Sequence, residues 1–287
     1  MKKIVFALFI VIFCSEIQAQ RTFSGIKKIS NANGTLWINY GYNRSFYSKS
    51  DLTLKSYYYD FSVKEGTYSD KQSKSFSDFL SVNTPNSPQY NLNVGYYYMN
   101  KYALSIGINH TKMIFDDGNN VLLNGRIDEG TDSIWSGQYN DQQVVTNRND
   151  FHFENNLNYF NLALTRTDKL FQSRNKLFAL SANFGLGIGA VVSKNSFRFQ
   201  NNFTEKIVSM SGFAISGQAS ARFEFFKNLF IQGELIGASV YQNKIKTRKD
   251  NLNTSGKQHF LMGQRVLTFG ILIYFKPING CNDCPVW

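Results

Sequence analysis

The sequence predicts an all-β fold, a transmembrane up-and-down antiparallel β-barrel of about ten strands, with twelve as the alternative. Apolar residues alternate with polar or small ones, as in residues 178–189, FALSANFGLGIG, and this period of two indicates a strand with one apolar face. Several such runs exceed about ten residues, whereas strands of globular proteins have about five or six and tilted membrane strands roughly 9–11. Tyr and Phe crowd the ends of the runs, as the aromatic girdles of membrane barrels do. These features favour the barrel over a secreted β-sandwich, which alternates in the same way.

Residues 1–19 are typical of a secretory signal peptide, because two lysines precede an apolar run over residues 4–14 and Ala19 marks a cleavage site. Acylation at Cys14 is the less favoured alternative. No apolar run of about 18 residues follows, which excludes helical membrane spans. The net charge of +11 favours phosphate-bearing lipid headgroups and anionic polysaccharides as partners, and no nucleic acid is expected for an exported chain.

One barrel domain is expected over residues 34–275, between an irregular N-terminal segment (20–33) and a periplasmic tail (276–287). The expected strands lie near residues 34–45, 52–63, 88–99, 101–115, 120–127, 156–167, 176–193, 211–226, 230–243 and 259–275. The long connection at 64–87 falls on the periplasmic side if there are ten strands.

Two turns set the expected register of neighbouring strands. Asp117-Gly118 is a favoured two-residue hairpin turn and would pair Ile114 with Val121. The three residues 227–229 would pair Phe226 with Phe230. Each register keeps apolar residues on one face.

The last strand carries a pattern at Thr268, Gly270, Ile273 and Phe275. It resembles the C-terminal signal by which the outer-membrane assembly machinery recognises barrels, which implies that machinery as a partner. Proline after Phe275 stops the strand. In the tail, Cys281 and Cys284 are expected to form a local disulfide, since the periplasm is oxidising, and the tail could dock a periplasmic partner.

The chain resembles the outer-membrane β-barrels of Bacteroidota-type Gram-negative bacteria. The segments PQYNLNVGYYYMNKYALSIGINHTKMIF and FFKNLFIQGEL, with the closing FGILIYF, carry the resemblance, which covers most of residues 34–275. It implies the fold and an outer-membrane location and implies no reaction.

A narrow barrel must fill its lumen with side chains, and buried charges need partners. Alternation places a polar set on the inward face as an expected luminal network: Ser216, Gln218, Ser220, Arg222, Glu224, Gln232 and Glu234. The turn at 227–229 would set Arg222 opposite Glu234 as an ion pair. A structural network is favoured over a constriction that reads a solute.

A basic loop is the second candidate site and would face outside. It carries Lys244, Lys246, Arg248, Lys249 and Lys257. It is either a solvated loop or a surface that contacts the phosphates of lipopolysaccharide.

No catalytic or metal site and no cofactor are expected. His110 and His259 are interpreted as interfacial or rim residues, and His152 as a solvated loop residue. The acids Asp128, Glu129 and Asp132 are interpreted as a solvated loop. The expected function is a structural or surface ligand-binding role without catalysis. A narrow pore for a small or hydrophobic solute is the first alternative, and a lipid-modifying barrel enzyme is the second.

Overall fold

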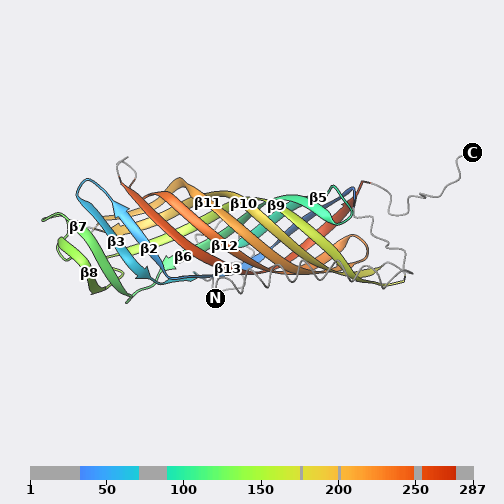
Figure 1. Cartoon of the computed structure of the whole chain (residues 1–287), viewed down its shortest axis with the longest axis horizontal. Coiled ribbons are helices and arrows are strands. Elements are labelled where there is room, and N and C mark those ends of the chain that lie inside the picture. Colours follow the sequence, from blue (N-terminus) through green and yellow to red (C-terminus); the bar gives the residue numbers. More distant parts are fainter. Residues whose placement is uncertain (1–32, 71–88, 175–176, 200–201, 249–253, 276–287) are drawn as a thin grey trace, which may run out of the picture. The chain divides into compact units, whose positions relative to one another are not determined.

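The computed structural model describes residues 33–70, 89–174, 177–199, 202–248 and 254–275, which contain thirteen β-strands (Figure 1). The all-β prediction is confirmed. The expected signal peptide, Lys249 and the tail with Cys281 and Cys284 lie outside the described residues. Within the described residues, no helix is long and apolar enough to cross a membrane.

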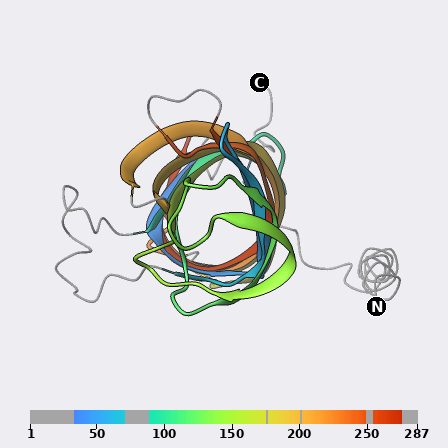
Figure 2. The same cartoon turned by 90° about the vertical axis from the view of Figure 1, so that its left-hand side faces the viewer.

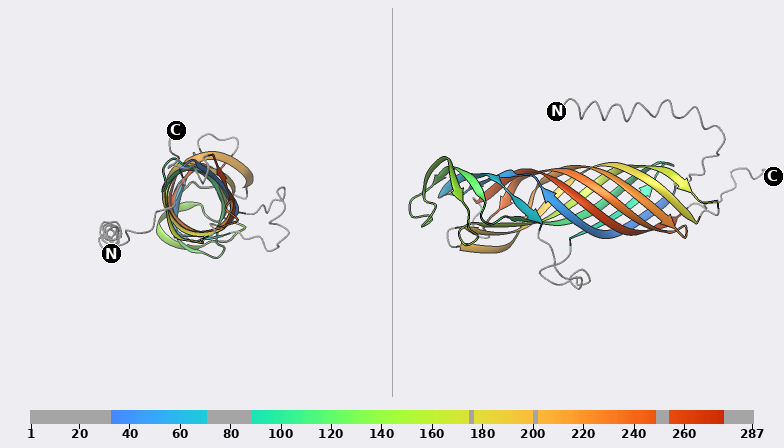
Figure 3. Two further views of the ribbon diagram at one scale, coloured as in Figure 1. Left: turned by 90° about the vertical axis from the view of Figure 1, so that its right-hand side faces the viewer. Right: turned by 90° about the horizontal axis from the view of Figure 1, so that it is seen from below.

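Eight of the described strands form a closed ring in which each pairs antiparallel with the next (Figures 2 and 3). They are β1 (Thr35–Tyr47), β5 (Tyr90–Tyr97), β6 (Tyr102–Phe115), β9 (His152–Gln172), β10 (Phe178–Phe199), β11 (Asn202–Phe225), β12 (Leu229–Lys246) and β13 (Ser255–Tyr274). The pairing of β13 with β1 closes the ring. A path that passes from each residue to its partner on the next strand, once round the ring, starts at Ile271 of β13 and returns to the same strand at Leu261. This stagger tilts the strands as barrels require.

Five shorter strands extend the barrel wall at the end shown at the left of Figure 1. They are β2 (Ser50–Lys55), β3 (Tyr59–Gly66), β4 (Tyr68–Asp70), β7 (Asn120–Ile127) and β8 (Gly137–Val145). β2 pairs with the end of β13, β3 with β2 and β7, β8 with β7, and β4 with β6. We call these five strands, with the adjoining ends of β10 to β13, the extension.

The expected hairpin at Asp117-Gly118 is wrong. Ile114 and Val121 are not partners, because β6 pairs with β9 and β7 pairs with β3 and β8. Gly118 takes a left-handed φ of 70° and its amide donates to the Thr146 carbonyl at 3.0 Å. The Asp-Gly step therefore bends a chain that continues from the ring into the extension. The expected single strand at 52–63 is instead the hairpin of β2 and β3, and β8 was not expected. The short β4 lies in the stretch that was expected to be a connection, and with it these differences account for thirteen strands in place of about ten.

The expected pairing of Phe226 with Phe230 is also wrong. Phe225 pairs with Leu229, so the turn spans residues 226–228. Phe226 and Lys227 have φ values of 53° and 69°, a left-handed conformation for which a non-glycine sequence gives no signal. Each partner shifts by two residues, so the inward and outward faces stay as predicted.

The expected periplasmic position of the 64–87 connection is wrong as well. Asp70 pairs with Met113 near the extension end of β6, and the Gln89 side chain donates a hydrogen bond to the Asp70 carboxylate. The chain thus leaves the wall and rejoins it at neighbouring points on the side of the extension.

The outer face of the ring carries a belt of exposed apolar side chains. Its members include Leu104, Ile106, Leu162, Leu164, Phe184, Leu186, Ile188, Ile215, Leu235, Leu267 and Phe269. Soluble proteins rarely expose so large an apolar surface, and a continuous belt on a closed barrel matches lipid chains. The fold is a transmembrane barrel of the bacterial outer membrane. Its short connections, such as residues 98–101 and 226–228, face the periplasm, and the extension faces outside.

The interior divides into layers. Near the periplasmic end Trp37, Tyr97, Ala103, Phe230 and Leu272 pack together. Polar side chains fill the membrane-spanning part. Above them a large aromatic and aliphatic core occupies the extension, where Trp135 stacks on Phe151 with ring centroids 5.5 Å apart. The extension is therefore a cored structure of its own above the membrane.

Candidate functional site

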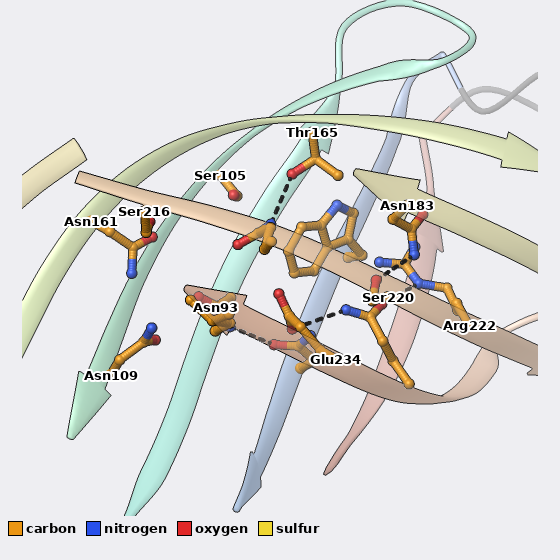
Figure 4. A pocket seen from close by; sticks show the side chains of 15 residues that line it. Asn93, Ser105, Asn109, Asn161, Thr165, Asn183, Ser216, Ser220, Arg222 and Glu234 are labelled. Atoms are coloured by element: carbon orange, nitrogen blue, oxygen red, sulfur yellow. Dashed lines mark hydrogen bonds between the residues drawn. The ribbon is translucent and has the colours of Figure 1, made fainter. Parts of the chain in front are cut away.

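Inward residues of β11 and β12 form the candidate site in the lumen (Figure 4). Strand alternation positions them, because every second residue points inward. Ser216, Arg222, Gln232 and Glu234 are buried, and Gln218 and Ser220 are half-buried. The structure brings all six together around one stretch of lumen. Glu224 lies one inward pair nearer the periplasm, opposite Phe230, and its carboxylate makes no hydrogen bond within the described residues.

Arg222 is only 2% exposed and occupies an aromatic cage near the periplasmic end. Its Nε donates to Gln232 Oε1 at 2.8 Å and its Nη1 donates to the Tyr97 hydroxyl at 3.1 Å. The guanidinium lies 4.3 Å from the ring centroid of Phe230 and 5.2 Å from that of Trp37. Cation–π attraction is strongest when the cation is desolvated, so the cage replaces the water that Arg222 loses.

The expected direct ion pair between Arg222 and Glu234 is wrong. The observed register sets Arg222 opposite Gln232 and Glu234 opposite Ser220. Gln232 links the two charges instead, since its Nε2 donates to Glu234 Oε2 at 3.3 Å while its carbonyl oxygen accepts from Arg222. The amide satisfies both charged groups, as buried charges require.

Strands β1, β5, β9 and β10 complete the network with residues that sequence reasoning missed. Asn93 Nδ2 donates to Asn39 Oδ1 at 3.1 Å. Asn183 Nδ2 donates to the Ser220 hydroxyl at 3.0 Å, and Gln218 Nε2 donates to the Thr165 hydroxyl at 3.2 Å. Their inward parity in the alternation is the signal that could have identified them.

The space enclosed by these side chains is small. The cavity lined by Arg222, Glu234 and the asparagines has a volume of about 20 Å³, which suffices for about one water molecule. Nearer the extension, Gln242 Nε2 donates to the hydroxyls of Ser193 and Ser211 at 2.6 and 2.8 Å, and Asn155 Nδ2 donates to Gln242 Oε1 at 3.0 Å. The lumen is thus crossed by side-chain hydrogen bonds at two levels.

The structure separates the residues of the basic loop. Lys244, Lys246 and Lys257 are exposed. Arg248 turns inward, where its Nη2 donates to the Phe199 carbonyl at 2.9 Å and its guanidinium lies 5.6 Å from the Phe197 ring centroid. Arg248 lies in the extension, and burial lowers its pKa from the usual value. Arg248 therefore belongs to the core of the extension.

The acidic residues at 128–132 stabilise a turn. Asp132 Oδ1 accepts hydrogen bonds from the backbone amides of Ile134 and Trp135, both at 2.8 Å, and Asp128 pairs with Arg126 at 3.0 Å. Within the described part of the chain, no group of three His, Cys, Asp or Glu residues could hold a metal ion.

Two histidines lie on the outer face and one is buried. His110 Nδ1 is 2.9 Å from Asn158 Oδ1, and its ring stacks on Tyr90. His152 is 6% exposed and therefore buried, which contradicts its interpretation as a solvated loop residue.

His259 was interpreted as a rim residue, and its contact with a serine was missed. Its Nε2 is 3.0 Å from the Ser239 hydroxyl, and its ring stacks on Tyr241 with centroids 4.1 Å apart. A serine nucleophile needs a base that a third group orients. No such group hydrogen-bonds the second ring nitrogen within the described residues. Both residues occupy outward positions in the alternation of β12 and β13, and this shared face is the sequence signal that could have indicated the contact.

No family model matches the sequence, and no curated protein matches it. Solved structures match its fold at low similarity. Ail, the attachment invasion locus protein of Yersinia pestis, has a TM-score of 0.34 and 12% identity, over 84% of this chain and 99% of that chain. The outer membrane protein OprG from Pseudomonas aeruginosa has a TM-score of 0.36 and 11% identity, over 84% and 97%. The outer membrane protease OmpT from Escherichia coli has a TM-score of 0.34 and 9% identity, over 84% and 96%.

Proposed function

We propose that this protein is a non-conducting outer-membrane barrel that holds a rigid extension at the cell surface, in a structural or ligand-binding role. The observation that carries the proposal is the filled lumen. The Arg222 cage, the hydrogen-bonded layer around Gln242 and the aromatic core of the extension follow one another along the barrel axis. A pore needs a continuous aqueous path, and the cavity of about 20 Å³ beside Arg222 holds about one water molecule.

The extension supports the ligand-binding part of the proposal. Its tip exposes Tyr57 and Tyr58, which are 75% and 56% accessible, and Ile134 of the neighbouring turn. A hydrogen bond from the Asp128 amide to the Tyr58 carbonyl at 3.0 Å joins the hairpin of β2 and β3 to the hairpin of β7 and β8. Tyr side chains supply large contact area at low cost in conformational entropy. A cored platform with exposed Tyr at its tip suits contact with a macromolecule outside the cell.

Other partners are proposed from the sequence. The exposed Lys244, Lys246 and Lys257 could contact phosphates of lipopolysaccharide, and the strand ending at Phe275 would engage the barrel assembly machinery. The tail with Cys281 and Cys284 could dock a periplasmic partner. Sequence resemblance supports placing the protein among the barrels of Bacteroidota-type bacteria.

Single-channel recording in planar bilayers tests the main proposal. We expect no steady conductance from the purified, folded protein at either polarity, because side chains occupy the lumen. Protease protection of the belt strands in the same lipid must first show that the barrel is inserted. Steady ohmic conductance from inserted protein would contradict the proposal and favour the narrow pore.

The Ser239–His259 contact supports a second candidate function, hydrolysis of lipid acyl esters at the outer face. The test is to measure turnover of phospholipid and of lipid A by the same preparation. If the contact is only structural, we expect no turnover. Turnover that Ser239→Ala abolishes, while the barrel stays folded, would make this second function the correct one.

A further inference from the structure

Two arginines face each other on the lipid-exposed surface. Arg44 of β1 and Arg265 of β13 are direct register partners, and both occupy outward positions of strands whose outward residues are otherwise mostly apolar or aromatic. Along β13, the outward neighbours Leu261 and Leu267 are 59% and 52% exposed. Like charges directly opposite on adjacent strands repel, and a cation on the lipid face of a barrel is unfavourable.

Neither arginine forms a close ion pair within the described residues. No carboxylate there lies within ion-pair distance of either guanidinium. Arg44 Nη1 is buried and makes no hydrogen bond, although the Arg44 guanidinium lies 5.1 Å from the Tyr42 ring centroid. Asp70 of the adjoining β4 attracts Arg44 electrostatically, and its carboxylate accepts hydrogen bonds from the Ser45 amide at 3.3 Å and from the Gln89 side chain. Asp70 offsets only one of the two positive charges, so the pair keeps a net positive charge that an anion from outside the chain can neutralise.

Their depth matches the headgroups of the outer leaflet. Arg265 lies ten residues along the chain from Phe275, which follows the periplasmic end of β13. At about 3.3 Å per residue and the usual strand tilt, this places Arg265 roughly 25 Å from that end, about the height of the apolar band of such barrels. The stacked rings of Tyr241 and His259 lie further outward, where an aromatic girdle is expected.

A shallow groove, widely open to the surroundings, adjoins the arginines on the same surface. It has a volume of about 670 Å³ and is lined by Arg44 and Arg265 together with Tyr42, Phe184, Leu235 and Leu267. Small outward residues, Ala219, Ala221 and Gly233, form its floor. An added Cβ at Gly233 would meet no atom within 4 Å. The rest of the lining is mostly apolar, and the inward-facing Ser220 and Glu234 are its polar members besides the two arginines.

We propose that Arg44 and Arg265 bind a phosphate of lipopolysaccharide, with one acyl chain of its lipid A lying in the groove. Paired guanidinium groups match the geometry and charge of a phosphate, and the anion removes their mutual repulsion. An apolar groove below a phosphate site fits a lipid that carries both groups. The site is separate from the basic loop at 244–257 and does not depend on whether the barrel conducts.

Native mass spectrometry of the folded protein in detergent micelles tests the proposal, with bis-phosphorylated lipid A as the added probe. We expect the wild type to bind lipid A, and Arg44→Gln with Arg265→Gln to weaken binding at least tenfold. Lipid A from which the phosphates have been removed should bind the wild type as weakly as lipid A binds the double variant. Lys227→Gln, which removes an exposed charge in the turn at the periplasmic end, should leave binding unchanged.

Two leucine substitutions, one inside the groove and one outside it, test whether the groove holds an acyl chain. Gly233→Leu should fill the floor and weaken lipid A binding several-fold without changing charge. Gly217→Leu, at another outward position outside the groove lining, should not. Both should keep the heat-modifiable mobility of a folded barrel. Equal binding by the wild type and the double arginine variant would overturn the proposal, as would equal binding of dephosphorylated lipid A. Equal binding of phosphatidylglycerol would overturn the assignment to lipopolysaccharide.

Discussion

Leu186→Arg is expected to prevent stable insertion of the barrel into the outer membrane. Leu186 is 68% exposed on the belt of β10, beside Leu164 of β9 and between Phe184 and Ile188 along its strand. A cation at this depth on the lipid face costs about 2–4 kcal/mol. The measurement is the amount of heat-modifiable, folded protein in outer-membrane fractions.

Leu186→Phe is the matched control, because it changes size and shape but keeps an apolar side chain in contact with lipid. It should insert like the wild type. If the arginine and phenylalanine variants accumulate equally in the outer membrane, Leu186 does not face lipid and the belt assignment is wrong.

The inward and outward faces could be predicted from the sequence because side-chain direction in a strand has a period of two. Leu186 was expected outside and Arg222 inside, and both expectations hold. A register error of two residues leaves this parity intact. The belt and the polar lumen therefore follow from alternation alone.

The partner of each residue could not be predicted. The left-handed Phe226 and Lys227 shift the β11–β12 register, and neither residue type indicates such a conformation. The Asp117-Gly118 step fits a hairpin turn as well as the bend between β6 and β7 that the structure shows. Local sequence does not decide between them, because one partner of β7 is the segment 59–64, which is distant in the chain, and the other is the following strand, 137–145.

The extension was missed for a different physical reason. The β8 sequence GQYNDQQVV is largely exposed along its length, so it shows no alternation of apolar and polar residues. Trp135, Phe151 and Phe199 lie outside the expected strands, yet they meet in one core. Their separation in the sequence conceals a cluster that only the folded chain brings together.

Arg222→Ala is expected to lower the free energy of unfolding by about 3–5 kcal/mol, the cost of removing one partner from a buried charged network. The substitution leaves the Glu234 carboxylate, which is 7% exposed, without a positive charge nearby. It also leaves the Gln232 carbonyl and the Tyr97 hydroxyl without their donor. Urea unfolding of the protein in lipid vesicles measures the loss.

A second substitution that removes the charge of Glu234 separates the electrostatic part of the stability loss from the part due to lost packing. Because Glu234→Gln removes the uncompensated charge but keeps the side-chain shape, the double variant with Arg222→Ala should be more stable than Arg222→Ala alone. Residues within one hydrogen-bond network typically show coupling of about 0.5–3 kcal/mol. Glu224→Ala, at the half-buried position that makes no hydrogen bond among the described residues, should change stability by about 0.5 kcal/mol or less. Strictly additive losses for Arg222→Ala and Glu234→Gln would show that Gln232 does not couple the two charges.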